Sequence, residues 1–558
     1  MKGRPAVCFF LAFALLLCGA IAYAWYCSGK TLTGMDDANI FFTYAENMAS
    51  GRGIVYGHNC EPVEGCTSML WLLLCAFNFL VGWNELGVLG FTCACLFAAQ
   101  AIWLAILHRL LRPECKTFLM PYGIYAILLL TSPGYALWMS VSLMDTSLWG
   151  LVFAALTYVL LDDAGRFPHG CKSIVMSAIP FAMAPLSRPE AMFFVPVCLI
   201  LMALNRRAGG CRFGALWIYG GIFLLSLAGL TLFRLAYFGY PLPNTYYAKV
   251  SPSLGYNIME GIKYAARCVT NGFPFLLLLL LIVGAISVLS RQVARWLVKR
   301  EALPVLTLCV LWFLCFMVQP VLTGGDHFAF HRFYQPVYPL VCALLATIGA
   351  RVLTKVADQI NFRWLVVSAI IGAFFVFRPS LIDFRNNFYA RNEFAIAQAG
   401  IETGLMLNAL YPDASNRPRV GVVIAGGIAR TYEGPIVDLM GLNDVHIAHF
   451  KGDRRGCKNH AAFEPSQFDS FDIDIMPIPP NDFMIRALKG MIICESFCST
   501  WRYGRLALRD NPSVGVSAFC RNSYLDACGL KYEFTDELVW NGECWTAVAM
   551  TESHARQP

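Results

Sequence analysis

Long apolar runs separated by short polar segments dominate the first two thirds of the chain. A helix needs about 20 predominantly apolar residues to cross a bilayer, so the shorter runs locate their ends only approximately. The pattern predicts a polytopic α-helical membrane protein with about 11 transmembrane helices. The predicted spans are residues 6–26, 86–108, 118–134, 146–161, 173–187, 190–204, 214–238, 273–290, 303–322, 334–350 and 364–378.

A further apolar run, 67–82, is placed by the distribution of positive charge. If the N-terminus is cytoplasmic and 67–82 lies against the outer face, 17 Lys and Arg fall in the cytoplasmic segments 1–5, 109–117, 162–172, 205–213, 291–301 and 351–363. The outer segments 27–66, 135–146, 186–190, 239–272 and 323–333 hold 7. This is the positive-inside bias of membrane proteins. We predict a cytoplasmic N-terminus and an extracytoplasmic C-terminus in a bacterial inner membrane.

The N-terminal run has a second interpretation. Lys2 and Arg4 precede an apolar stretch that ends in Ala22-Tyr23-Ala24, which is also the pattern of a cleavable signal peptide. Cleavage there would leave the rest of the predicted topology unchanged.

The pattern changes after residue 380, where no apolar run long enough to span a membrane appears. Residues 391–409 have helical spacing. Two short apolar runs, Arg419–Ile424 and Pro435–Met440, flank a turn at Ala425-Gly426-Gly427. We predict a soluble extracytoplasmic α/β domain over 380–558, after a transmembrane catalytic domain over 1–379 whose first outer loop is 27–85.

Composition supports a membrane protein. Of the 558 residues, 57% are hydrophobic and 14% are charged, and the mean hydropathy is +0.55. Soluble domains carry about 25% charged residues, so a wholly soluble or disordered chain is excluded. The net charge of +7 reflects the cytoplasmic Lys and Arg, and no basic stripe with interleaved aromatic residues predicts a nucleic-acid partner.

Cysteines gather in two outer regions. An even number of cysteines on the oxidising face of a membrane predicts disulfides, and a Cys60–Cys66 bond would pin the first outer loop. Zinc is the alternative for Cys494 and Cys498, although no His lies at ligand spacing there. The C-terminal domain contains Cys457, Cys494, Cys498, Cys520, Cys528 and Cys544.

Ionisable residues near the membrane gather on one predicted face. Such residues are costly close to lipid, and they commonly mark functional sites. The cytoplasmic loops carry no comparable acidic set, so we predict one polar cavity just outside the bilayer. Its candidate residues come from five separate outer loops and are Asp36, Asp37, Glu64, Asp145, Arg188, Glu190, Lys249, Asp326, His327 and Arg332.

Each of these residues also has a structural interpretation. Asp36 or Asp37 can cap the helix predicted to follow them. Arg188 and Glu190 flank Pro189 and can form an ion pair that holds a short hairpin.

The remaining candidates have structural alternatives of their own. Lys249 can extend to the lipid headgroups, and Glu64 and Asp145 can be ordinary loop acids. A structural network is the alternative for Asp326, His327, His331 and Arg332.

A cavity of this kind can carry out acid–base chemistry on a substrate delivered by lipid. A carboxylate can take the proton from an acceptor hydroxyl as its oxygen attacks a sugar carbon. Arg and Lys can stabilise a phosphate leaving group. Because a lipid phosphate is already a good leaving group, we predict that no cofactor is required, although the carboxylates can hold a divalent metal.

Several motifs resemble those of GT-C glycosyltransferases that use polyprenyl-phosphate sugars, in particular the mycobacterial terminal arabinofuranosyltransferase group and its bacterial relatives. The first outer loop contains MDDANIFFTYAENMASGRGIVYG followed by EPVEGCTSMLW. Further matching segments are SLMDTSLWGL, LSRPEAMFF, YFGYPLPNTYYAKV, GGDHFAFHRFYQPVYPL and GVVIAGGIARTYEGPIVDLMGLND. The motifs occur in the family's order between residues 35 and 444.

The resemblance implies roles for individual residues. An acidic residue of the first outer loop is the general base of an inverting transfer, which here means Asp36 or Asp37, with Asp36 favoured. The donor phosphate would be held by Arg188, Lys249 and Arg332. The donor sugar or lipid entrance would be lined by Asn244, Tyr246 and Tyr247, although anchoring at the membrane interface explains these residues equally well.

We therefore predict an integral-membrane hexosyl- or pentosyltransferase, with a pentofuranose as one candidate sugar. It would move a single sugar from a polyprenyl-phosphate donor to an extracytoplasmic glycan, lipid or protein. The alternative is a transporter or flippase, although transporters commonly carry inverted repeats and midplane polar sites, which this chain lacks in its sequence pattern. A receptor or scaffold is a third hypothesis, and it leaves the charged loops unexplained.

Overall fold

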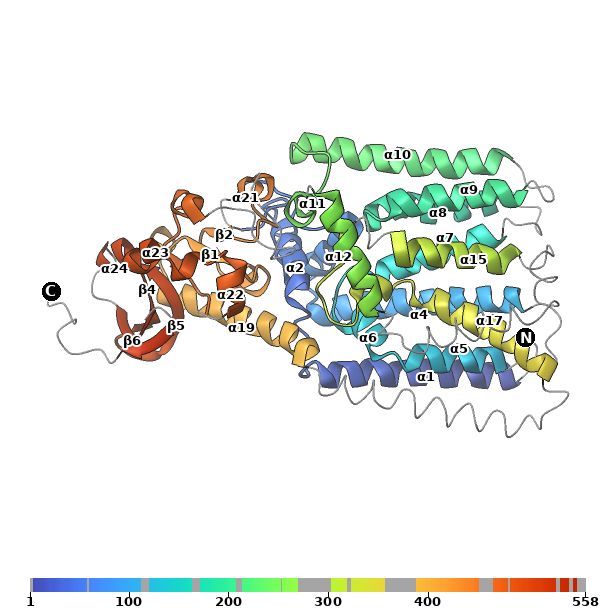
Figure 1. Ribbon diagram of the computed structural model, residues 1–558, viewed down its shortest axis with the longest axis horizontal. Coiled ribbons are helices and arrows are strands. Elements are labelled where there is room, and N and C mark those ends of the chain that lie inside the picture. The colour runs from blue at the N-terminus through green and yellow to red at the C-terminus, as the bar shows by residue number, and fades with distance from the viewer. Residues whose placement is uncertain are drawn as a thin grey trace.

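Apolar helices lie side by side in a bundle, and a domain containing a sheet is attached at one end of it (Figure 1). The arrangement comes from a computed structural model. It describes residues 4–57, 60–111, 120–162, 171–206, 213–251, 253–268, 303–318, 323–356, 388–450, 465–479, 482–527, 532–540 and 545–548.

The helices of the bundle coincide with the predicted spans. Among the described helices, three are long and apolar enough to cross a membrane, and a bent pair at 120–141 makes a fourth candidate. The protein is therefore an integral membrane protein. Predicted spans 273–290 and 364–378 lie outside the described residues. The bundle helices are α1 Arg4–Cys27, α4 Glu85–Leu110, α5 Met120–Leu130, α7 Thr146–Asp162, α8 Cys171–Ser187, α9 Ala191–Arg206, α10 Phe213–Tyr237, α15 Leu303–Phe313 and α17 Tyr338–Val356.

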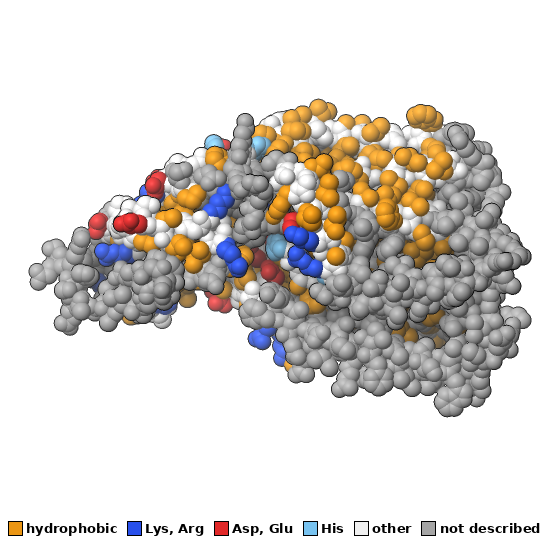
Figure 2. Space-filling view, viewed as in Figure 1, with side chains coloured by type: hydrophobic (Ala, Val, Ile, Leu, Met, Phe, Trp, Pro, Cys, Tyr) orange, Lys and Arg blue, Asp and Glu red, His pale blue; other side chains and the backbone are white. Residues whose placement is uncertain are grey.

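The surface of the bundle has the character expected of a lipid-facing surface. Hydrophobic side chains cover much of its visible face over α10 (Figure 2). On that helix Trp217 and Leu225 are 79% and 74% exposed. Charged side chains gather instead on the C-terminal domain and at its junction with the bundle (Figure 2).

One bundle helix is broken close to the junction. After α5 the chain bends by 74° into α6 (Pro133–Ala136) and the π-helix η1 (Leu137–Val141). Leu143 then adopts a positive φ of 57°, a backbone conformation that is rare for a bulky residue. The bend directs the segment 142–145 towards the start of α2 (Asp36–Ala49), where the Met35 N–H donates to the Ser142 carbonyl at 3.3 Å.

The run 67–82 does not traverse the bundle, as the charge distribution predicts. It contains α3 (Met69–Leu80), which packs along α2 through an edge contact between Phe42 and Phe79 at 5.6 Å. Twelve helical residues extend about 18 Å, less than the hydrocarbon thickness of about 30 Å. Arg430 pairs with both Glu46 of α2 and Glu85 of α4, so α2 and the start of α4 lie at the same end.

The C-terminal domain is built on a mixed sheet. Its strands occur in the order β2-β1-β3-β5-β4-β6-β7. β1 is parallel to β2 and β3, and the remaining neighbours are antiparallel. The strands are β1 Val420–Val422, β2 Ile436–Asp438, β3 Ile475–Met476, β4 Trp501–Leu508, β5 Asn511–Arg521, β6 Tyr532–Trp540 and β7 Trp545–Val548.

The predicted elements of this domain are confirmed. The helical spacing at 391–409 corresponds to α19 (Phe388–Leu410), and the two apolar runs correspond to β1 and β2. The Gly-Gly turn begins α20 (Gly427–Thr431), which forms the crossover between these parallel strands. The predicted domain boundary at 379/380 lies outside the described residues.

The hydrophobic core of this domain continues into the first outer loop. One buried cluster contains Tyr44 and Tyr56 from the loop together with Val422 and Leu439 from the domain. A second cluster forms the interior of the bundle. The domain and the first outer loop therefore share one core.

The predicted Cys60–Cys66 disulfide is absent. The Cys60 Sγ lies 3.9 Å from the Ile436 carbonyl oxygen, and Cys66 is a buried thiol. Cys494 and Cys498 are likewise not joined, and their Sγ atoms contact the carbonyls of Gly490 and Ile492. The shared core holds the loop, so it does not depend on a covalent link. Cys457, Cys528 and Cys544 lie outside the described residues.

Candidate active site

A cavity of about 460 Å³ lies where the bundle meets the C-terminal domain. Most of its wall is apolar. The apolar side chains come from α2, α8, α9, α10 and the following loops and include Phe41, Met192 and Leu227. The charged residues of the wall are Asp37, Arg188, Glu190, Arg234, Lys249, Asp326 and Arg332. Side chains from all the predicted outer loops thus converge, either in this wall or directly behind it.

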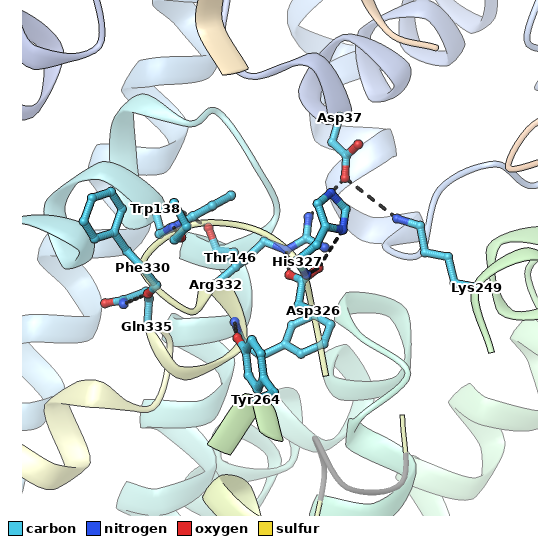
Figure 3. Close-up of polar contacts among 12 residues, drawn as sticks. Asp37, Trp138, Thr146, Lys249, Tyr264, Asp326, His327, Phe330, Arg332 and Gln335 are labelled. Atoms are coloured by element: carbon cyan, nitrogen blue, oxygen red, sulfur yellow. Dashed lines mark hydrogen bonds and ion pairs between the residues drawn. The ribbon is translucent and has the colours of Figure 1, made fainter. Parts of the chain in front are cut away.

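Asp37 is the acid of the first outer loop that faces the cavity. Its Oδ2 lies 3.1 Å from Arg332 Nη1 and 3.9 Å from Lys249 Nζ, and Figure 3 shows Lys249 extending towards it. The Asp37 side chain is 21% exposed. Burial acts to raise its pKa, but the charges of Lys249 and Arg332 outweigh this effect and hold the pKa below its ordinary value. Asp37 is therefore ionised at neutral pH.

Arg332 is held by a second carboxylate. Its Nε donates to Asp326 Oδ2 at 2.8 Å, and its guanidinium lies over the Phe328 ring at 4.2 Å. The two residues that precede Asp326 in the chain, Gly324 and Gly325, are glycines with positive φ. A Cβ on Gly325 would collide with the Tyr264 ring, so only glycine fits there.

The two histidines of this loop differ. His327 stacks on Phe328 at 4.3 Å, and its Nδ1 lies 3.7 Å from Asp326. His331 has a positive φ of 54°, and burial together with Arg267 lowers its pKa to about 4. His331 is therefore neutral, in agreement with its structural interpretation.

Arg188 is fixed by acids on both sides. Its Nη1 donates to both Asp145 oxygens, at 3.1 and 2.9 Å, and its Nε and Nη2 donate to Glu190 at 3.1 and 2.8 Å. Asp145 is completely buried and lies behind Arg188. The predicted cavity residue Asp145 therefore supports the wall without lining it, whereas Arg188 and Glu190 line it directly.

Glu64 also lies behind the wall. Its two carboxylate oxygens accept from Arg234 Nε and Nη2 at 2.7 and 2.8 Å. Arg234 lines the cavity but was missed by the sequence analysis, because it lies near the end of an apolar span. The sequence did contain a signal for this pair. Arg234 is a basic residue at the outer end of a span, and Glu64 is an acid in an outer loop that can pair with it.

Asp36 faces away from the cavity, so the geometry reverses the preference for it as the base. Its Oδ2 accepts from the Gly426 N–H and its Oδ1 from the Gly427 N–H, both at 2.9 Å. Burial raises the pKa of Asp36 to about 7, although these two hydrogen bonds act to lower it. Asp36 attaches α2 to the C-terminal domain.

Of the three residues predicted to line the sugar or lipid entrance, only Tyr246 is in the wall of the cavity. Tyr246 lines the cavity and is 46% exposed. Asn244 instead donates to the carbonyls of Gly441, Leu442 and Asp444 at 2.9 to 3.1 Å. It begins α11 (Asn244–Lys249) and attaches this helix to the C-terminal domain.

Tyr247 contributes to the same attachment. Its ring lies 4.1 Å from His449 at the end of α21 (Val445–His449). Asn244 and Tyr247 therefore hold α11 in place, and Lys249 at its end is positioned as a consequence.

Glu393 is a further acid that the sequence analysis did not identify. It lies on α19, and burial raises its pKa to about 8, with additional repulsion from Asp37 and Asp36. It contributes to the acidic surroundings of α2 from the side of the C-terminal domain. The sequence offers little signal for it, since Glu393 is one of two Glu residues in α19, with Glu402.

Within the described residues, no group of three or more His, Cys, Asp or Glu side chains is arranged to hold a metal ion. Asp37 and Asp326 both pair with Arg332. The absence of a cofactor requirement stays a prediction.

The fold is similar to that in the crystal structure of ArnT from Cupriavidus metallidurans bound to undecaprenyl phosphate. The TM-score is 0.49 and the sequence identity 12%, with 92% of this chain and 98% of that chain covered. Comparisons with protein-family models and with curated protein sequences gave no match.

Proposed function

We propose that this protein is a GT-C-type glycosyltransferase that transfers a single sugar from a polyprenyl-phosphate donor to an extracytoplasmic acceptor. The observation that carries the proposal is the contact of Asp37 with Arg332 and Lys249 in a cavity whose wall is otherwise mostly apolar. The sequence motifs support it, because Asp37, Arg188, Lys249 and Arg332 all lie in segments that resemble GT-C motifs.

The shape and chemistry of the cavity fit a lipid phosphate. Arg188 and Arg234 are each matched by a carboxylate behind the wall, and Arg332 is matched by Asp326. Lys249, whose contact with Asp37 is 3.9 Å long, is therefore the cation best placed to meet an added anion, with Arg332 on the other side of Asp37. The apolar part of the wall, which includes Phe193 of α9, provides surface for a polyprenyl chain. Phe193 is 55% exposed, which favours entry of the chain from the lipid side.

The reaction follows from these positions. The acceptor hydroxyl oxygen forms a bond to the anomeric carbon while the bond from that carbon to the phosphate oxygen breaks. Asp37 takes the hydroxyl proton, and the polyprenyl phosphate leaves with an additional negative charge that Lys249 and Arg332 stabilise. An inverting step needs the base and the leaving oxygen on opposite sides of the carbon, so donor binding must separate both Lys249 and Arg332 from Asp37.

The orientation follows from the same proposal. The N-terminus and the C-terminal domain lie at opposite ends of the bundle (Figure 1). The positive-inside bias then places the N-terminus in the cytoplasm and the cavity on the outer side of a bacterial inner membrane. A polyprenyl-phosphate sugar with its headgroup at the outer face can enter the cavity there.

The test compares Asp37→Asn with the wild-type protein in cells that lack the native protein. Mass analysis of envelope glycans should show one missing pentose or hexose unit in the variant, as in cells without the protein. Transfer should fall about 10² to 10⁴-fold, the usual contribution of a general base. Normal glycans in cells that make Asp37→Asn at wild-type levels would contradict the assignment.

A second measurement separates transfer from transport. Purified protein in liposomes is given polyprenyl-phosphate sugars of several hexoses and pentoses, together with acceptor glycans from the envelope. A transferase releases polyprenyl phosphate in proportion to new glycosidic bonds. Movement of the donor between leaflets without such release would establish the flippase instead.

A further inference from the structure

The C-terminal domain contains a second cavity, of about 550 Å³, to which no role has been assigned above. Its polar lining comes from Arg419 before β1, Asp444 and His446 around the start of α21, and Gln467 and Ser470 of the 3-10 helix η7 (Pro465–Phe471). Segments some 50 residues apart in the chain thus meet around one space. Cavities of about 300–1,000 Å³ with a few convergent polar groups are typical ligand sites.

The polar groups of this cavity are available to a ligand. Within the described part of the chain, the Arg419 guanidinium, the His446 imidazole and the Gln467 amide make no hydrogen bond to another side chain or to the backbone. Arg419 and His446 are exposed. The Asp444 carboxylate already accepts from the Ile447 N–H at 2.9 Å, and the Ser470 hydroxyl donates to the Gln467 carbonyl at 2.6 Å. The remaining lone pairs of these two groups add acceptors to the three groups named first.

The floor of the cavity is apolar. Val437 and Ile447 are buried there, and Phe450 and Phe471 are half-buried beside them. Sugar rings have an apolar C–H face as well as hydroxyl groups, so an apolar floor with a mixed polar rim suits them. Arg419 and Asp444 carry opposite charges in the same lining, which makes the cavity a poorer site for a simple anion than a lining with cations alone.

The second cavity is close to the first one. Leu442 lines the first cavity and Asp444 lines the second, and two residues span at most about 7 Å of chain. Asn244 fixes this connecting segment through three carbonyls. An oligosaccharide in the second cavity would therefore contact the same segment that lines the first cavity through Leu442.

We propose that the second cavity binds a neutral oligosaccharide, which is the part of the acceptor that precedes the hydroxyl to be glycosylated. This inference rests on the proposed transferase function for its role, but binding itself does not require catalysis. The two ideas can therefore be tested separately.

The experiment measures binding of linear oligosaccharides to the full chain in nanodiscs. The probes are chains of four to six mannose, glucose, galactose or arabinofuranose units, detected by saturation-transfer NMR. All binding measurements use the Asp37→Asn background, so that no transfer consumes the probe, whereas KM values for the acceptor are measured with Asp37 intact. Arg419→Gln should weaken binding about tenfold, the effect of one hydrogen bond to a charged group. Ser470→Trp should abolish binding by filling the space, and Arg505→Gln on β4 is the matched control.

The outcomes distinguish this site from the proposed function. Loss of binding in Arg419→Gln and Ser470→Trp, with binding kept in Arg505→Gln, supports the site even if no transfer is found. If transfer occurs but neither substitution changes oligosaccharide binding or the KM for the acceptor, the site is wrong and the transferase stands. Displacement of the oligosaccharide by inorganic phosphate at equal concentration would also overturn the proposal, because it would show an anion site.

Discussion

The Asp36 carboxylate accepts the backbone N–H of Gly426 at 2.9 Å, which joins the first residue of α2 to a turn 390 residues further along the chain. Gly426 has no side chain to obstruct this approach, and a Cβ there would collide with Asp36. Successive residues of a helix point about 100° apart. The contact therefore directs Asp36 towards the domain while Asp37 faces the cavity.

The first prediction is that Asp36→Ala weakens the attachment of the C-terminal domain. The substitution leaves the buried N–H groups of Gly426 and Gly427 without their acceptor, at a cost of about 1–3 kcal/mol for each unsatisfied group. Thermal unfolding should occur at lower temperature, and limited proteolysis should release the domain faster. Transfer should fall less than in Asp37→Asn, and it should fall in parallel with the loss of folded protein.

The control for this substitution is Asp36→Asn, which retains one acceptor oxygen and should lie between wild type and Asp36→Ala in stability. If Asp36→Asn abolishes transfer with wild-type stability while Asp37→Asn remains active, the base is Asp36 and the assignment made from the geometry is reversed.

The second prediction concerns pH. The pKa of Asp36 is about 7 in the folded protein but about 4 in an unfolded chain. Between these values the folded state keeps a proton that the unfolded state releases, so stability falls as pH rises, by up to about 1.4 kcal/mol per pH unit. Asp438, whose pKa burial raises to about 6, acts in the same direction. Asp37 has a lowered pKa and acts in the opposite direction, below about pH 4.

The measurement is thermal unfolding and proteolytic release of the domain between pH 5 and 8, for wild type and Asp36→Asn. The stability advantage of wild type over the variant should shrink as pH rises through about 7 and become constant about one pH unit higher, where Asp36 is ionised in both states. An advantage that grows with pH would show that Asp36 is ionised in the fold throughout this range.

The third prediction is that Lys249→Gln reduces kcat about 10²-fold, because the variant loses one cation that stabilises the departing phosphate. Asp37 also loses a positive neighbour 3.9 Å away, so its pKa should rise and the acid limb of the pH–rate profile should move to higher pH. Lys249→Arg should keep part of the activity. Lys263→Gln is the matched control, since Lys263 pairs with Glu260 at 2.7 Å and does not line the cavity. Equal kinetics for Lys249→Gln and the control would remove Lys249 from the site.

Part of this site was predictable from sequence because charged side chains are energetically unfavourable near lipid. Asp37, Arg188, Lys249 and Arg332 lie at the outer ends of spans, and the topology alone sends them to one face. The choice between Asp36 and Asp37 was not predictable, because it depends on the rotation of α2 set by Gly426. The ion-pair partners were also not predictable. In the sequence Arg234 is one more basic residue at the end of a span, and only the structure shows that it pairs with Glu64.

The C-terminal domain shows the same limit. The short apolar runs on either side of the Gly-Gly turn predict the elements that become β1 and β2, but their parallel pairing is seen only in the structure. The antiparallel pairing of β3 with β5 likewise joins Ile475 to Cys520 across a long sequence separation that no local pattern encodes. Asn244 was misjudged for a similar reason, since its three acceptors lie about 200 residues away.

The fourth prediction is that Asp145 stabilises the structure and does not take part in the reaction. This carboxylate is completely buried, so Arg188→Met leaves it without its cation and should destabilise the protein by about 3–5 kcal/mol. Asp145→Leu should cost less, because Arg188 keeps its ion pair with Glu190. The double variant should be destabilised by less than the sum of the single effects. Asp145→Ala should reduce transfer per folded molecule less than Asp37→Asn, because Asp145 does not reach the cavity. If instead Asp145→Ala abolishes transfer at unchanged unfolding temperature, Asp145 takes part in the reaction, and Arg188 must move aside when substrate binds.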